Sequence, residues 1–150
     1  MTISATPLSG APLGSGLSAY IDSTQVSIAR PQADLSLGGW KPSRGASLSA
    51  MLNETTPDDS SYIHGAAGAR CEIGLSTTTA PGSAVQCVEY RASSSTGTPV
   101  TVSLWQSGAQ VASWAHALTP TDRLYVQALT ADQIALLVPG VAVSVVLVVG

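Results

Sequence analysis

Two alternating segments decide the fold of this chain: Pro99-Val-Thr-Val-Ser-Leu-Trp105 and Ala109-Gln-Val-Ala-Ser-Trp-Ala115. Apolar and polar side chains alternate in both, which is the period of a β-strand with one buried face. The residues between them, Gln106-Ser-Gly108, contain a Ser-Gly pair that favours a tight turn. The sequence therefore predicts a β-hairpin, in which Trp105 and Trp114 lie on paired strands and are free to face the same side.

Shorter segments with the same period occur on both sides of the hairpin. The stretch Arg70-Cys-Glu-Ile-Gly-Leu75 is expected to turn its odd-numbered residues, Cys71, Ile73 and Leu75, inward. Residues 141–149 are rich in β-branched side chains and read as a buried closing strand. This stretch is too short for a membrane-spanning helix, which needs about twenty residues. Further strand candidates are residues 24–29, 34–37, 84–92 and 124–128, and residues 47–52 fit either a strand or a turn of helix.

This spacing of about eight short strands is typical of a sandwich or barrel. We predict an all-β, jelly-roll-like β-sandwich over residues 34–150, with one short helix near residues 131–138. Thr130 is the expected N-cap of that helix, and Gln133, three residues later, completes a capping box. Pro139-Gly140 is expected to end it.

Residues 1–33 differ from the rest of the chain. Residues 1–16 contain Pro and Gly every few positions and no charge, yet apolar side chains keep recurring. One interpretation is a loose tail. The one we favour is an extended arm that lies in a groove of a partner protein and becomes ordered on contact. Its expected partner-binding side chains are Ile3, Leu8, Leu13 and Leu17.

The chain is poor in charge. Charged residues make up 10% of it, against roughly 25% in a typical soluble domain. Either the composition reflects a biased host genome, or much of the surface packs against neighbouring molecules, since interface cores are depleted of charge. The six basic residues are scattered and the net charge is −3, which disfavours nucleic acid as a partner. No basic segment precedes an apolar stretch near Met1, so we expect neither a secretion signal nor membrane insertion.

Residue types capable of catalysis occur without the arrangement that catalysis needs. His64 follows Tyr62-Ile63 beside a loop, and His116 lies at the end of a strand. Serines are abundant, but no G-x-S-x-G turn is present. We therefore expect structural or surface histidines, no catalytic residues, no enzymatic activity and no cofactor.

Metal binding is also not expected. Glu54, Asp58 and Asp59 could ligate a hard cation, but their spacing does not match a calcium loop. The favoured interpretation is a turn in which the Asp side chains accept hydrogen bonds from nearby backbone N–H groups. Cys71 and Cys87 are expected to be two buried thiols, although a disulfide between adjacent strands remains an alternative.

The tryptophans have two interpretations. Trp105 and Trp114 could together form a sugar-binding platform, while packing in a core or interface is the commoner use of such side chains. We retain both residues as candidate partner-binding positions.

Two segments resemble small structural proteins of tailed bacteriophages: Gly39-Trp-Lys-Pro-Ser-Arg-Gly-Ala-Ser-Leu48 and Asn53-Glu-Thr-Thr-Pro-Asp-Asp-Ser-Ser-Tyr-Ile63. In that family a Trp and a Gly-rich turn precede an E-x-x-P-D-D-x-x-Y-I stretch, and a β-sandwich with a hairpin follows. The likeness covers roughly residues 39–150 and supplies no catalytic residues. It implies a non-enzymatic virion protein that assembles in the host cytoplasm, most simply a capsid decoration or cement protein.

The partners implied are the major capsid protein or other virion proteins, and further copies of the chain, with a trimer favoured. A tail or neck fibre, or a receptor- or glycan-binding module, is the alternative. A hydrolase would require one of the two histidines in a polar cleft, hydrogen-bonded to a carboxylate beside a serine.

Overall fold

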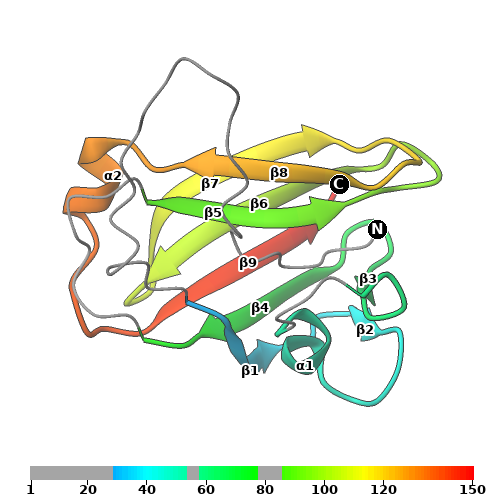
Figure 1. Cartoon of the computed structure of the whole chain (residues 1–150), viewed down its shortest axis with the longest axis horizontal. Coiled ribbons are helices and arrows are strands. Elements are labelled where there is room, and N and C mark those ends of the chain that lie inside the picture. Colours follow the sequence, from blue (N-terminus) through cyan, green and yellow to red (C-terminus); the bar gives the residue numbers. More distant parts are fainter. Residues whose placement is uncertain (1–28, 54–57, 78–85) are drawn as a thin grey trace, which may run out of the picture.

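The computed structural model describes residues 29–53, 58–77 and 86–150, and it confirms the all-β prediction (Figure 1). Its largest part is a five-stranded antiparallel sheet, called the main sheet here. Across this sheet the strands follow the order β1 (Pro31–Ser36), β4 (Arg70–Leu75), β9 (Val143–Val149), β6 (Pro99–Gln106) and β7 (Ala109–Ala117).

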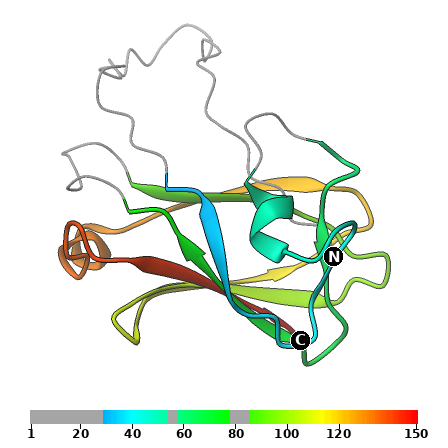
Figure 2. The same ribbon diagram turned by 90° about the horizontal axis from the view of Figure 1, so that it is seen from below.

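A second layer covers one face of the main sheet, called its inner face, so the described residues form a sandwich (Figure 2). This layer contains the antiparallel pair β5 (Cys87–Ala92) and β8 (Arg123–Ala128). Helix α1 (Leu48–Leu52) and the short pair β2 (Lys41–Pro42) and β3 (Ile63–His64) lie beside that pair.

The core lies between the layers because the strands alternate as predicted. On β4, Cys71 and Ile73 are buried and Leu75 is half-buried, whereas Arg70 points away from the core. Burial of apolar side chains from both layers is the main source of stability in such a sandwich. Cys71 and Ile73 belong to the main core cluster, whose other members are Trp40, Leu48, Leu52, Ile63, Ala69, Tyr90, Ala92, Val100, Val102, Leu118, Leu147 and Val149.

Both cysteines are free thiols, as expected. Cys71 is buried in the core, and burial raises the pKa of its thiol to about 12. Cys87 is only half-buried; burial, with a smaller effect from the Glu89 carboxylate, raises its pKa as well. Both thiols therefore stay protonated and unreactive near neutral pH.

Strand β1 begins at Pro31, three residues before the predicted start of the sandwich. The preceding Arg30 already belongs to the folded body, since its N–H donates to Ser76 Oγ at 2.9 Å. Most of the predicted arm, including Ile3, Leu8, Leu13 and Leu17, lies outside the described residues.

Helix α2 (Ala131–Ala135) has the predicted capping box. The Gln133 N–H donates to Thr130 Oγ1 at 3.2 Å, and the Thr130 N–H donates to Gln133 Oε1 at 2.9 Å. The helix is shorter than the predicted residues 131–138, because the buried Gln106 of β6 binds the backbone that follows it. Gln106 Oε1 accepts from the Val138 N–H at 2.7 Å, and Gln106 Nε2 donates to the carbonyls of Val138 and Val141 at 3.1 Å each. No helix within the described ranges is long and apolar enough to cross a membrane.

Candidate functional site

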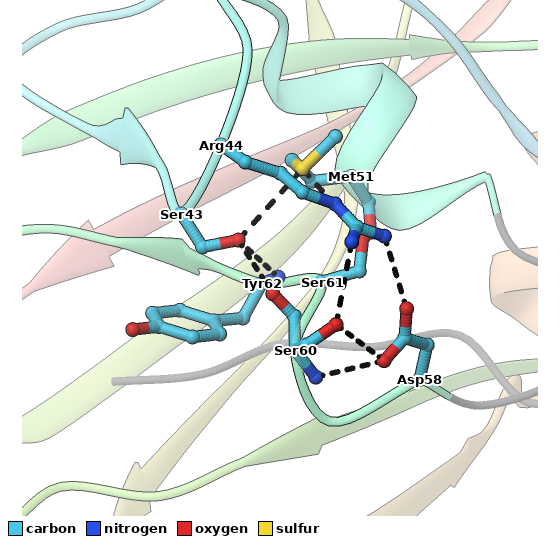
Figure 3. Close-up of polar contacts among 7 residues, drawn as sticks. All are labelled: Ser43, Arg44, Met51, Asp58, Ser60, Ser61 and Tyr62. Atoms are coloured by element: carbon cyan, nitrogen blue, oxygen red, sulfur yellow. Dashed lines mark hydrogen bonds and ion pairs between the residues drawn. The ribbon is translucent and has the colours of Figure 1, made fainter.

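The two segments that carry the phage resemblance are joined by polar contacts (Figure 3). Ser43 is at their centre: its N–H donates to the Tyr62 carbonyl at 2.7 Å, and its Oγ donates to the Ser60 carbonyl at 3.0 Å. The same Oγ accepts from the Tyr62 N–H at 3.1 Å, while Ser61 Oγ donates to the Met51 carbonyl at 3.2 Å. These bonds tie a loop to β2 and α1. The residues that carry the phage resemblance therefore have a structural role, because they hold this loop against β2 and α1.

Asp58 completes this network (Figure 3). Its Oδ1 accepts from the Ser60 N–H at 2.9 Å and from the Ser60 hydroxyl at 2.6 Å, and its Oδ2 lies 3.0 Å from an Arg44 nitrogen. The Ser60 hydroxyl and N–H, with a smaller effect from Arg44, lower the pKa of the Asp58 carboxyl. The turn interpretation is confirmed for this residue.

The adjacent carboxylate makes a different contact. Asp59 Oδ1 lies 2.9 Å from an Arg91 nitrogen on β5, so Asp58 and Asp59 face different arginines. Glu54, the third acidic residue of the predicted cation alternative, lies outside the described residues. In the part of the chain that the structure describes, no three metal-ligating side chains gather in one group.

The histidines occupy aromatic surroundings. The His116 ring lies 4.4 Å from that of Tyr125 and 5.8 Å from that of Tyr90, between β7 and the second layer. Burial lowers the pKa of His116. His64 is exposed on β3, with its ring 6.2 Å from that of Tyr62. Neither imidazole has a carboxylate partner among the described residues, so neither forms the arrangement that a hydrolase would require there.

The two hairpin tryptophans lie on opposite faces of the main sheet, so the possibility of a shared platform is excluded. The two-residue turn would pair Trp114 with Thr101, on the same side as Trp105, if the ladder were regular. A β-bulge leaves Val111 without a partner and shifts the register by one, so Trp114 pairs with Val102. Trp114 therefore turns inward, against a buried cluster of Leu104, Val111 and Ala112, and Trp105 stays on the outer face.

A groove of about 360 Å³ crosses the outer face beside Trp105. Its lining comes from β1, β4, the β6–β7 hairpin and the start of β9. Glu72 of β4 is the ionisable residue in this lining: its Oε1 accepts from Ser144 Oγ at 2.8 Å, and its carboxylate lies 3.6 Å from Arg70. Of the residues that line the groove, sequence reasoning proposed only Trp105 as a binding residue. Gly74, which has no side chain, and Ser144, the one polar residue of the apolar strand β9, were the available signal.

A second feature is a group of exposed apolar side chains on β8 (Arg123–Ala128), on α2 and in the turn after α2. Of the seven large hydrophobic side chains that the described residues expose, five lie between residues 124 and 141. This stretch contains one charged residue, Asp132. Sequence reasoning did not select residues 124–141 as a candidate site, although the low charge of this stretch is visible in the sequence. We call it the β8–α2 surface, and its members are Leu124 (51% exposed), Val126 (52%), Leu136 (60%), Val138 (56%) and Val141 (37%).

Comparison of the chain with models of protein families, with curated proteins and with solved structures gave no match. Function is therefore inferred from the β8–α2 surface and from the outer-face groove.

Proposed function

We propose that this chain is a non-enzymatic structural protein of a tailed-bacteriophage virion that binds between capsid subunits as a decoration or cement protein. The observation that carries the proposal is the β8–α2 surface. Exposed apolar patches on soluble proteins commonly mark sites of protein association. The low charge of residues 124–141 matches the composition of interface cores. The resemblance of residues 39–48 and 53–63 to phage structural proteins suggests the kind of assembly.

Such a protein would act through many weak, identical contacts. Burying a few hundred Å² of apolar surface contributes several kcal/mol, at roughly 25 cal/mol per Å². A homo-oligomer, with a trimer favoured, would present several copies of the β8–α2 surface to one junction between capsid subunits. Simultaneous binding of these copies would raise the apparent affinity far above that of a single contact.

A charge placed on the β8–α2 surface should prevent particle binding. The test adds purified protein to phage particles that lack it, and measures the fraction retained after sedimentation. Leu124→Asp should reduce retention at least about tenfold, because a carboxylate buried in an apolar interface without a partner is costly. Electron microscopy of decorated particles should show regular density on the shell.

Leu37→Asp is the matched control, since Leu37 is 48% exposed and Leu124 51% exposed, on different parts of the molecule. Both variants should keep the melting temperature of the parent protein, because neither side chain is in the core. Full retention of Leu124→Asp, or density on the tail alone, would contradict the proposal.

A further inference from the structure

The groove on the outer face has a floor made of small side chains. Strand pairing sets Gly74 of β4 next to Ser144 of β9, and Ser144 next to Trp105 of β6. These strands lie side by side in the main sheet (Figure 1). Since neighbouring strands are about 4.8 Å apart, the row from Gly74 to Trp105 spans roughly 10 Å. Leu35 of β1 packs over Gly74, and the short side chain at Ser144 leaves a depression beside Trp105.

The two walls of the groove are apolar. Trp105 lines one side, and Leu35 of β1 lies over Gly74 on the other. A Cβ added at Gly74 would lie 3.5 Å from Leu35 Cγ, which is ordinary contact. The leucine therefore occupies the space above the glycine, and the groove lies between this leucine and the indole of Trp105.

The rim of the groove carries hydrogen-bonding groups. Glu72 Oε1 and Ser144 Oγ are already bonded to each other at 2.8 Å, which fixes both side chains. A carboxylate has about four acceptor positions, so Glu72 can still accept from a ligand. Gln32 and Ser107 also line the groove and add amide and hydroxyl groups.

This combination fits the chemistry of a sugar. A pyranose ring has a face of C–H bonds and a rim of hydroxyl groups. The negatively polarised face of an indole attracts the C–H bonds, and the carboxylate, amide and hydroxyl groups bond to the rim. The Glu72 carboxylate disfavours phosphate-bearing ligands. At about 360 Å³, the groove is at the small end of the range for ligand sites, roughly 300–1,000 Å³.

We infer that the outer-face groove binds a single pyranoside, with Trp105 stacking on the sugar ring and Glu72 and Ser144 bonding to its hydroxyl groups. This inference goes beyond the proposed virion role and does not depend on it. The groove lies on the outer face of the main sheet, whereas the β8–α2 surface belongs to the second layer and the turn after α2.

The test is a titration of the full chain, labelled with ¹⁵N, with three probes: methyl β-D-glucopyranoside, methyl β-D-galactopyranoside and methyl α-D-mannopyranoside. The three tryptophans give three indole N–H resonances, and Trp105→Phe identifies that of Trp105. At least one probe should shift the Trp105 indole and Ser144 amide resonances, leaving the Trp40 and Trp114 indoles in place. A dissociation constant on the order of millimolar is expected for one ring.

Two variants test the geometry. Trp105→Ala should weaken binding at least about tenfold, because the stacking surface is lost. Since this variant lacks the Trp105 indole, its binding is measured from the Ser144 amide resonance. Ser144→Val places a larger apolar side chain in the depression beside Trp105 and removes the Ser144 hydroxyl, so it should abolish binding as followed by the Trp105 indole resonance. Leu124→Asp, outside the groove, should bind the glycoside like the parent protein.

The inference is overturned if none of the three glycosides moves the Trp105 resonance at concentrations up to ~50 mM, well above the expected dissociation constant. It is also overturned if Ser144→Val binds as tightly as the parent chain. Because Leu124→Asp tests particle binding and Ser144→Val tests sugar binding, failure of one proposal is distinguishable from failure of the other.

Discussion

Asp34 joins strand β1 to helix α1 through its two carboxylate oxygens. Its Oδ2 accepts from the Leu48 N–H at 2.9 Å, and its Oδ1 accepts from the Ser49 N–H at 2.6 Å. Ser47 Oγ accepts from the Ala50 N–H at 3.2 Å. N–H groups that a short helix cannot pair internally are thereby satisfied. Burial by itself would raise the pKa of Asp34, but the hydrogen bonds from Ser49, Leu48 and Ser47 outweigh it and lower the pKa.

Replacing this carboxylate should change the acid sensitivity of the fold. The folded pKa of Asp34 lies below its ordinary value of 3.8, so the unfolded chain binds the proton more tightly. The stabilisation is present above about pH 4 and is lost as the pH falls through the folded pKa. Asp34→Asn should lower the free energy of unfolding at pH 7 by roughly 1 kcal/mol, and by less at pH 3, as measured by urea unfolding. An equal loss at both pH values would contradict this account.

At the scale of elements, a buried amide determines where α2 ends and β9 begins. Gln106 is 6% exposed, and its side chain makes the contacts to Val138 and Val141 described above. These bonds satisfy backbone groups beyond the last turn of α2, so the chain can leave the helix without unpaired buried polar atoms. The β6–β7 hairpin thereby fixes a connection that lies about thirty residues later in the sequence.

Gln106→Ala should remove three hydrogen bonds and leave the Val138 N–H without its partner. The expected loss in the free energy of unfolding is roughly 2–3 kcal/mol. Urea unfolding measures this loss, and hydrogen exchange should show faster exchange in residues 136–142. The control is Gln110→Ala on the adjacent strand β7, an exposed position, which should cost less than about 0.5 kcal/mol. Similar losses for the two variants would show that the buried amide does not hold this turn.

At the scale of the whole molecule, the two layers offer surfaces of different chemistry. The second layer and the turn after α2 carry the apolar β8–α2 surface, while the outer face of the main sheet carries the groove beside Trp105. A protein held to a shell by the first surface would leave the second available for a small ligand. The same body would then both attach to an assembly and contact sugars.

Removal of residues 1–28 tests the predicted arm. The deletion stops there because Arg30 and β1 belong to the sandwich. The shortened chain should keep the far-ultraviolet circular dichroism of a β-protein and a melting temperature within about 5 °C of the parent, since the main core cluster is retained. It should also lose particle binding, because the arm is expected to lie on neighbouring subunits. Undiminished binding would reject the arm hypothesis, and loss of folding would show that these residues belong to the sandwich.

The sequence by itself determined the features that depend on neighbouring residues. Alternation at 70–75, 99–105 and 109–115 predicted strands, because successive side chains of a strand point to opposite faces. The Ser107-Gly108 turn and the Thr130 capping box were likewise local, since each is complete within four residues.

Only the tertiary structure decided the features that depend on pairing between distant segments. The bulge at Val111 turned Trp114 inward, and Gln106 ended α2 early. The pairing of Gly74 with Ser144, seventy positions apart, made the floor of the groove. No local pattern encodes which strand becomes the neighbour of another, because register and strand order are set by the packing of the whole core.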